Sequence, residues 1–449
     1  MKNKFGLSFY ILVVLFSIQW DTMYSQEYKK VYTYSPFIWK SEPPGNCPFE
    51  KSTEITGIRF KGKGILYDAP DTFYPTWASD GHLYSPITDG NLYGFSFNSF
   101  KGKDASTGAA KMIGNDPLNL DIYPVSVHKS SAEPYSGRYP CGSLIHNGVW
   151  YYGTYCLDYK DSEEYPYRVT TEDGLVVDIC KCKPKYDLTD TCMNINYLGP
   201  FVGFRTSTDY GKTWKETPHT PDAPIFSDPG IPFTPTKIGA PHFVDFGKEM
   251  EHSPDGYAYL VAHGSIDNDP LPKVANASWV TGDAIYLLRV LPSLENMNDP
   301  SKYEFFAGYD KNNEPEWTSA FNLIKPLFEW NNHCGCVNVT YNPELKRYIM
   351  FVSYGEHTRS TFNTYVLESN EITGPWKLIS YMEKFGEQAY FVHTPSKFIS
   401  KDGSSAWLFY SANFQSPNYK ENHRSYPPGS GYGLSIQEIE FIIKQEESE

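Results

Sequence analysis

Three acidic residues stand where the chain turns into or out of apolar, strand-like segments. They are Asp71 in Ala-Pro-Asp-Thr, Asp89 in Thr-Asp-Gly-Asn and Glu387 in Phe-Gly-Glu-Gln-Ala-Tyr. Glycosidic bonds are ordinarily cleaved by two carboxyl groups, one protonated to assist the leaving oxygen and one ionised to activate water or attack the sugar. We predict that Asp89 and Glu387 are such a catalytic pair, with Asp71 as a third catalytic carboxylate that shifts a neighbour's pKa or binds sugar hydroxyls. The alternative for Asp71 and Asp89 is a turn in which the carboxylate accepts backbone hydrogen bonds.

Histidines form a second group of candidates, which we expect to bind substrate. His242 in Ala-Pro-His-Phe and His263 in Val-Ala-His-Gly belong to one stretch of chain, and His393 lies in a later strand-like segment. Two histidines that face one site can be a base and an acid, metal ligands, or a hydrogen-bonded pair in the core. The sequence leaves these three roles open.

An arginine and a tyrosine complete the expected substrate-binding set. Arg205 follows Val-Gly-Phe in an apolar segment, and its guanidinium suits a uronate carboxylate, with a structural ion pair as the alternative. Tyr74 offers a flat aromatic face for a sugar ring, with core packing as the alternative.

The composition favours short strands and turns over helices. Aromatic residues make up 16% of the 449 residues, and there are 34 Gly and 34 Pro. Aromatic side chains favour strands, whereas Gly and Pro mark turns. The formal net charge of −14 excludes nucleic acid as a partner, because its phosphates require a basic surface. We therefore expect a poly- or oligosaccharide as the ligand.

The first residues have the pattern of an export signal. Lys2 and Lys4 precede an uncharged apolar run over 6–18, so 1–25 are expected to be the signal peptide of a secreted or periplasmic protein. The run is roughly a dozen residues, shorter than the ~20 that cross a bilayer. The expected remainder is an N-terminal segment over 26–55, a single domain over 56–445 and an acidic tail over 446–449. We expect a monomer without an integral membrane span.

The cysteines predict disulfides, because disulfides are the default in an exported protein. The spacings Cys180-Lys-Cys182 and Cys334-Gly-Cys336 differ from the Cys-x2-Cys usual in zinc sites, so no cofactor is expected, and a structural or site metal ion stays open. The full set is Cys47, Cys141, Cys156, Cys180, Cys182, Cys192, Cys334 and Cys336.

One layout of strands recurs five times along the chain. Each round has an apolar strand, a turn, an aromatic-rich second strand and one or two strands with alternating polarity, which is the arrangement of a propeller blade. The rounds cover 74–90, 141–207, 239–290, 336–368 and 390–436. Asp80-Gly81 and Asn147-Gly148 are expected hairpin turns.

The recurrence predicts an all-β fold, a five-bladed β-propeller with a Cys-rich excursion in the second blade over about 158–196. A β-sandwich with long loops is the alternative. In a propeller, the loops that enter each innermost strand and those between the second and third strands open on one face. Asp71, Asp89 and Glu387 are all expected there.

Two resemblances support this architecture. Ser207-Thr-Asp209-Tyr-Gly211-Lys-Thr213-Trp214 resembles the Asp-box, a turn in propeller blades of sialidases and other glycan-active propellers, although a sialidase's arginine triad is not found. Most of 56–441 resembles a family of secreted five-bladed propellers from polysaccharide-degrading bacteria, some of them similar to endo-acting arabinan hydrolases. The matching stretches are 77–84, 88–90, 285–290, 337–342, 373–376 and 395–411.

The second resemblance implies a five-bladed fold and glycoside hydrolysis. Cys336 departs from this resemblance, because an acidic residue is expected at its position, ahead of the fourth blade's first strand. The family's catalytic pair therefore cannot be assigned directly to residues of this chain. We expect a glycoside hydrolase. The alternatives are a polysaccharide lyase, with a His or Tyr base and Arg205 or a metal neutralising a uronate, and a non-catalytic glycan-binding propeller.

Overall fold

The computed structural model describes 29–133, 135–159, 167–170, 176–179, 198–226, 228, 236–267, 278–356, 360–414 and 426–444. The expected signal peptide, the acidic tail and most of the Cys-rich excursion lie outside these residues. Among the described residues, no helix is long and apolar enough to cross a bilayer.

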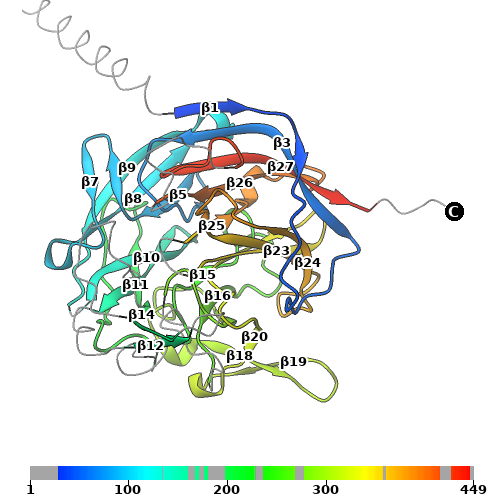
Figure 1. The fold of residues 1–449 in the computed structure, drawn as a ribbon. Helices are drawn as coiled ribbons and strands as arrows, with labels where there is room; N and C mark the ends of the chain where they lie inside the picture. The colour runs from blue at the N-terminus through cyan, green and yellow to red at the C-terminus, as the bar shows by residue number, and fades with distance from the viewer. Residues whose placement is uncertain are drawn as a thin grey trace, which may run out of the picture.

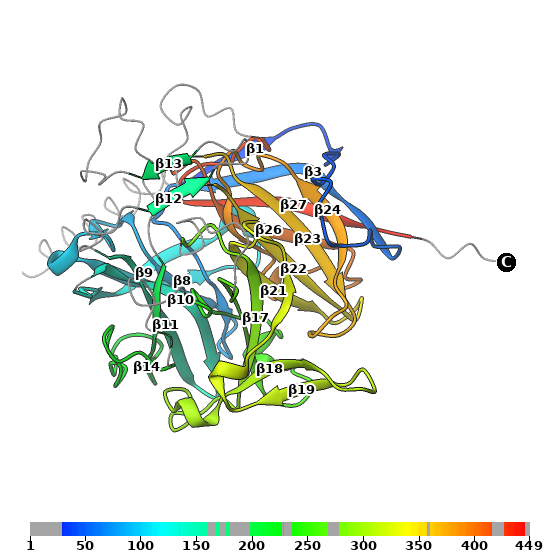
Figure 2. The ribbon, with the colours of Figure 1, turned by 60° about the horizontal axis from the view of Figure 1, so that its bottom comes forward.

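Five antiparallel sheets follow one another along the chain and form the blades of a β-propeller (Figures 1 and 2). Blade 1 consists of β4 (Thr76–Trp77), β5 (Leu83–Ile87), β8 (Ser106–Ile113) and β9 (Asp121–Lys129). Blade 2 consists of β10 (Tyr135–His146), β11 (Val149–Tyr159) and β14 (Leu198–Ser207). Blade 3 consists of β15 (His242–Phe243), β16 (Ala258–Gly264), β17 (Ala284–Val290), β18 (Glu304–Tyr309) and β19 (Pro315–Thr318), with β20 (Pro326–Glu329) paired to β17. Blade 4 consists of β21 (Cys336–Asn342), β22 (Arg347–Tyr354), β23 (Asn363–Ser369) and β24 (Lys377–Met382).

Blade 5 joins the two ends of the described chain. It consists of β25 (Tyr390–His393), β26 (Ser405–Ser411), β27 (Leu434–Ile443), β3 (Ile55–Tyr67), β1 (Lys29–Thr33) and β2 (Phe37–Ile38). The strand β3 lies between β27 and β1, so the first long strand of the chain completes the last blade (Figure 1). Ile65 of β3 and Ile436 of β27 share a buried cluster with Leu83 of blade 1, which closes the ring by apolar packing.

The remaining elements are short. Two small hairpins pair β6 (Gly90–Leu92) with β7 (Phe95–Phe97) and β12 (Tyr167–Thr170) with β13 (Val176–Ile179). The described helices are single 3₁₀ turns at Gly102–Asp104, Pro117–Asn119, Lys248–Met250, Pro300–Lys302, Phe321–Leu323 and Ser396–Phe398.

Both hairpin turns expected from the sequence are present. Asn147 and Gly148 have φ of 49° and 74°, and they connect the paired residues His146 and Val149. A type I′ turn requires positive φ at both central residues, which Asn-Gly tolerates best. Gly81 likewise has φ of 82°, so local turn chemistry determines both hairpins.

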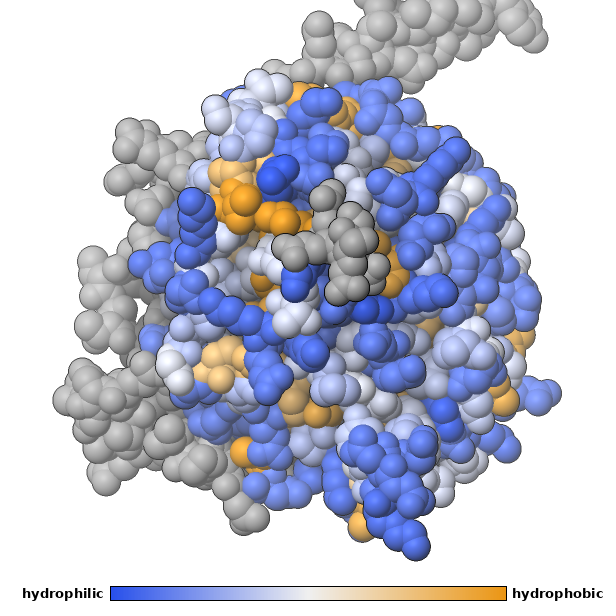
Figure 3. Space-filling model, turned by 90° about the vertical axis from the view of Figure 1, so that its right-hand side faces the viewer, coloured by the Kyte–Doolittle hydropathy of each residue, from blue (hydrophilic) through white to orange (hydrophobic). Residues whose placement is uncertain are grey.

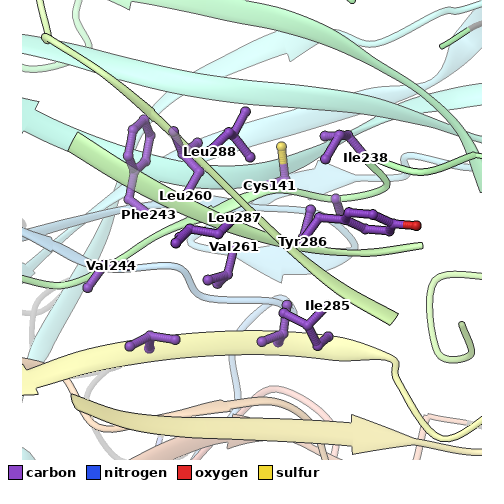
Figure 4. Packing of buried hydrophobic residues seen from close by; sticks show 14 of the residues in the cluster. Cys141, Ile238, Phe243, Val244, Leu260, Val261, Ile285, Tyr286, Leu287 and Leu288 are labelled. Atoms are coloured by element: carbon purple, nitrogen blue, oxygen red, sulfur yellow. The ribbon is translucent and has the colours of Figure 1, made fainter. Parts of the chain in front are cut away.

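Each inner strand is buried on both faces because neighbouring blades cover its two sides. In β16 and β17 the described residues are almost all buried, although successive side chains point to opposite faces of a strand. Leu260, Val261, Leu287 and Leu288 thus pack against the blades on either side (Figure 4). At the surface shown in Figure 3, hydrophilic side chains dominate and apolar ones form small separate patches.

The five described cysteines form no disulfide, which corrects the expectation for these residues. They are Cys47, Cys141, Cys156, Cys334 and Cys336. All except Cys47 are fully buried and lie within the apolar clusters between strands, where a free thiol packs as a small hydrophobic side chain. Cys180, Cys182 and Cys192 lie outside the described residues.

The turn after β14 connects blades 1 and 2. The Asp209 carboxylate accepts hydrogen bonds from the Thr213 amide at 2.9 Å and the Thr213 hydroxyl at 2.6 Å. Gly211 has φ of 86°, and the Trp214 indole N–H donates to Ser126 Oγ of blade 1 at 3.0 Å. The Asp209 carboxylate thus fixes the turn, Gly211 supplies its positive φ, and Trp214 attaches the turn to blade 1.

Candidate active site

Asp71 and Asp89 are brought together by a short antiparallel bridge at the entrance to blade 1. The Asp71 amide donates to the Asp89 carbonyl at 2.9 Å, and the Asp89 amide donates to the Asp71 carbonyl at 3.0 Å. Residues directly opposite in an antiparallel pair point their side chains to the same face, with Cβ atoms about 5 Å apart. The backbone therefore places the two carboxyl groups side by side.

The Asp71 carboxylate accepts three hydroxyl hydrogen bonds. Tyr390 donates to Oδ2 at 2.7 Å, while Tyr432 and Thr88 donate to Oδ1 at 2.8 Å and 2.9 Å. Tyr390 begins β25 and Tyr432 precedes β27, so both tyrosines belong to blade 5. Asp71, which is 7% exposed, thus links the first and last blades.

Of the two residues, Asp89 is the more exposed. It is partly exposed, and its Oδ1 accepts hydrogen bonds from the Ser99 amide at 2.6 Å and the Ser99 hydroxyl at 2.8 Å. Ser99 follows β7, so the β6–β7 hairpin, which begins directly after Asp89, folds back to hold its side chain.

The two carboxyl groups differ in proton affinity. Burial, and then the negative charge of Asp71, raise the pKa of Asp89 to about 8. Burial also raises the pKa of Asp71, but the hydrogen bonds from Tyr390, Tyr432 and Thr88 favour its ionised form. With a pKa of about 8, Asp89 is mostly protonated at neutral pH, and the hydrogen bonds that Asp71 accepts lower its pKa relative to burial alone.

Glu387 lies in the turn before β25, and it has a local role that its sequence context does not reveal. Its φ is +65°, in the left-handed region that is uncommon for residues other than glycine. Its amide donates to the Lys384 carbonyl, and its carbonyl accepts from the Phe362 amide, both at 2.9 Å. The side chain is partly exposed. Glu387 is connected to the carboxylate pair through β25, which carries Tyr390.

His242 lies in an aromatic cluster near the axis. Its ring centroid is 4.7 Å from that of Tyr74 and 5.1 Å from that of Phe391. Burial, together with the nearby His393 and His263, lowers the pKa of His242 well below its usual value. The ring is 2% exposed, and its Nε2 has no hydrogen-bond partner among the described residues.

The other two histidines bond to the backbone rather than to each other. His263 Nε2 donates to the Ser278 carbonyl at 3.0 Å, and His393 Nδ1 donates to the Phe391 carbonyl at 2.8 Å. Burial lowers the pKa of both to about 4, so they are neutral at pH 7. Among the described residues, no group of three or more His, Cys, Asp or Glu side chains is arranged to hold a metal ion.

Tyr74 and Arg205 do not fit their expected substrate-binding roles. Tyr74 is 5% exposed and packs edge-on against Phe391 with ring centroids 5.0 Å apart, so it is a core side chain. Arg205 is completely buried. Its Nε donates to Glu216 at 2.9 Å and its Nη2 to the Lys129 carbonyl at 2.7 Å, so it forms a structural ion pair and a hydrogen bond from blade 2 to blade 1.

The sequence did not identify the partners of the carboxylate pair as site residues. Tyr390 starts the innermost strand of blade 5, and this position alone could have suggested that it faces the axis. Nothing local marks Tyr432 or Ser99, because their contacts with Asp71 and Asp89 depend on ring closure and on the β6–β7 hairpin.

Comparison with known proteins identifies no matching family model and no matching curated protein. Among solved structures, a β-fructofuranosidase from Bombyx mori is 13% identical with a TM-score of 0.42, and the alignment covers 92% of this chain and 66% of that one. An exo-1,5-α-L-arabinanase from a bovine ruminal metagenomic library is 13% identical with a TM-score of 0.40, covering 85% and 99%. An α-L-arabinofuranosidase from Podospora anserina is 10% identical with a TM-score of 0.38, covering 91% and 96%. At these values nothing follows about activity, and the blades are defined by the strand pairing itself.

Proposed function

We propose that this protein is a glycoside hydrolase that acts on a poly- or oligosaccharide, with Asp71 and Asp89 as its acid–base pair. The observation that carries the proposal is the carboxyl pair itself, whose members share one face of a backbone bridge and differ in their hydrogen-bond partners. Two carboxyl groups with separated proton affinities are what glycoside hydrolysis requires.

Each carboxyl group has a role that follows from its surroundings. Asp89 is partly exposed and protonated, so it donates its proton to the glycosidic oxygen as the bond to the anomeric carbon breaks. In this proposal Asp71 acts as a carboxylate, the form that hydrogen bonds from Tyr390, Tyr432 and Thr88 favour, and it either takes a proton from the attacking water or attacks the sugar itself. In the second case, Asp89, now ionised, takes a proton from water, and this water cleaves the glycosyl ester on Asp71 and restores both carboxyl groups. Both routes release a hemiacetal, which is a new reducing end.

The other expected residues take supporting roles in this proposal. Glu387, at the start of blade 5, accepts hydrogen bonds from sugar hydroxyls. His242, His263 and His393 are neutral and lie in the packed interior, where they support the aromatic cluster beside the pair. This arrangement differs from the expectation that Asp89 acts with Glu387, because the bridge joins Asp89 to Asp71.

The burial of Arg205 removes the main support for the alternative that the protein is a lyase. A lyase needs a cation to neutralise the uronate carboxylate, and the expected arginine is instead buried against Glu216. A hydrolase needs no such group.

The test is to incubate the purified protein with arabinans, xylans and uronate-rich pectic and algal polysaccharides, measuring reducing ends and ultraviolet absorbance together. We expect reducing ends without a new ultraviolet absorbance, and a loss on the order of 10²–10⁴-fold in the Asp89→Asn variant, which lacks the acid. Tyr426→Phe, at a site 48% exposed, is the matched control and should keep full activity.

The remaining outcomes separate the alternatives. An unsaturated, ultraviolet-absorbing product would identify a lyase, and binding of a glycan without any cleavage would identify a binding propeller. Either result contradicts the proposal.

A further inference from the structure

Two arginines of blade 2 lie side by side where this blade meets blade 1. Arg138 belongs to β10 and Arg205 to β14. Arg205 is completely buried, and the Arg138 side chain is 16% exposed. A buried guanidinium requires an anionic partner, because the loss of hydration around its charge is costly. The way in which that partner is bound indicates which ligands the pair can accept.

One carboxylate serves both guanidinium groups, and it does so through a single oxygen. Glu216 Oε2 lies 2.9 Å from Arg205 Nε and 3.8 Å from Arg138 Nη1. The first distance is that of a charge-assisted hydrogen bond, whereas the second is too long for a hydrogen bond. The two cations thus converge on one position, and Glu216 bonds to only one of them.

Both guanidinium groups also keep donors that the chain does not use. Arg138 Nε and Arg205 Nη1 are buried and have no hydrogen-bond partner among the described residues. A guanidinium presents its N–H groups in a planar fork, and an unpaired buried donor costs about 1–3 kcal/mol. A ligand with several acceptor oxygens can pair donors that a single carboxylate oxygen leaves unpaired.

The positive charge of the arginines reaches their neighbours despite Glu216. Burial, and then the charge of Arg205, lower the pKa of His128 to about 3 and also lower the pKa of Arg138. His128 is therefore neutral at pH 7. The field that disfavours a proton on His128 favours an anion beside the arginines.

The carboxylate that occupies this position is the most exposed member of the cluster. The Glu216 side chain is 56% exposed, and Glu216 directly follows the bridge between Thr206 and Lys215. An exposed carboxylate gains little from an ion pair, because water solvates it almost as well. Glu216 can therefore turn into solvent and leave the guanidinium groups to an external anion.

The convergence of two guanidinium forks selects among anions. Both contacts of Glu216 with the pair use Oε2. Sulfate and phosphate carry their oxygens at the corners of a tetrahedron and have a larger charge than a carboxylate. Each guanidinium can therefore bond to oxygens of its own. Chloride offers no separate acceptors for the two forks.

We propose that Arg138 and Arg205 form a binding site for a tetrahedral oxyanion, sulfate or phosphate, which takes the place of the Glu216 carboxylate. The oxyanion is either the free ion or an ester on a glycan, since both present the same oxygens to the guanidinium groups. The site goes beyond the proposed function because no bond breaks there. Arg205 gains no part in hydrolysis, because it lies in the third strand of blade 2 and the Asp71–Asp89 bridge lies at the entrance to blade 1.

The test is calorimetric titration of the full chain with sodium sulfate, sodium phosphate and galactose 6-sulfate at matched ionic strength, with sodium chloride as the reference. We expect saturable binding of sulfate and phosphate and none of chloride. Saturable binding of galactose 6-sulfate would support a site that also accepts an ester on a glycan. Binding of the free ions alone would support a site for the inorganic ion.

Glu216→Gln removes the internal competitor and nearly preserves the size of the side chain. It should tighten oxyanion binding at least tenfold, because the guanidinium groups then lack their carboxylate. Glu440→Gln, which removes the carboxylate 3.0 Å from Arg59 in blade 5, is the matched control. This control should bind oxyanions like the unchanged chain.

Two changes at Arg138 test the second guanidinium. Arg138→Gln removes its charge and should weaken binding at least tenfold, as expected for the loss of a hydrogen bond to a charged group. Arg138→Lys keeps the charge but loses the planar fork, so it should also bind more weakly than the unchanged chain. Circular dichroism first shows that each variant is folded, and the lysine variant makes the comparison if the glutamine variant is not.

Three results would overturn the inference. They are the absence of saturable sulfate or phosphate binding in both the unchanged chain and Glu216→Gln, binding by Glu216→Gln that is no tighter than that of the unchanged chain, and full affinity in the folded Arg138 variants. None of these measurements depends on reducing-end release, so failure of this proposal and failure of the proposed hydrolysis are separate results.

Discussion

The environment of each carboxyl group in the Asp71–Asp89 pair determines its protonation, and this has a consequence for stability. The pKa of Asp89 is about 8 in the folded protein against an ordinary value of 3.8. Between about pH 4 and 8, the folded chain therefore holds a proton that the unfolded chain has released. The stability from this proton is fully present below about pH 4 and is lost as the pH rises through about 8.

We therefore predict that Asp89→Asn changes the pH dependence of stability. From pH 5 to pH 8, the unfolding free energy of the unchanged chain should fall relative to that of the variant, because asparagine does not titrate. Urea denaturation at four pH values measures this. Parallel curves for the two proteins would show that Asp89 ionises at its ordinary pKa.

At the scale of elements, the hydroxyl groups around Asp71 fasten blade 5 to blade 1. Tyr432 donates to the Asp71 carboxylate at 2.8 Å, and a hydrogen bond to a charged group contributes roughly 1.5–3 kcal/mol. The strand β3 completes blade 5 from the other end of the chain. The sheet of blade 5 thus joins the two ends of the described chain, and the Asp71 contact joins blade 5 to blade 1.

Tyr432→Phe removes only the polar contact. We predict that it lowers the unfolding free energy by about 1.5–3 kcal/mol, whereas the same change at the exposed Tyr426 costs less than about 0.5 kcal/mol. Chemical denaturation of both variants makes the comparison. Equal stabilities would show that Tyr432 contributes nothing to ring closure.

The blades could be predicted from the sequence because their signals are local. Asn147-Gly148 marks its own hairpin, and the apolar runs of β16 and β22 mark strands that are buried on both faces. The assignment of β3 to blade 5 could not be predicted in this way, because it pairs residues from opposite ends of the chain. The same limit explains why Tyr432 was missed and why Arg205 was expected to bind substrate.

At the scale of the whole molecule, the buried histidines limit stability in acid. The pKa of His263 and of His393 is about 4 in the folded state, below the ordinary value of about 6.5. The unfolded chain binds protons as the pH falls below about 6.5, and the folded chain does not until about pH 4. Stability is therefore lost over this interval.

We predict that His393→Gln weakens this acid dependence. Between pH 6.5 and pH 4.5, the unfolding free energy of the unchanged chain should fall more steeply than that of the variant, since glutamine does not bind a proton. Thermal melts across this range, with His252→Gln at an exposed position as the control, measure the difference. The same slope in all three proteins would contradict a depressed His393 pKa.

The central claim is that Asp71 and Asp89 together cleave a glycosidic bond. The most direct measurement is reducing-end release at pH 7 by the unchanged chain, Asp71→Asn, Asp89→Asn and Tyr426→Phe, each first shown to be folded by circular dichroism. We predict release by the unchanged chain and Tyr426→Phe, and a loss on the order of 10²-fold or more in each aspartate variant. Full activity in either folded aspartate variant would contradict the claim.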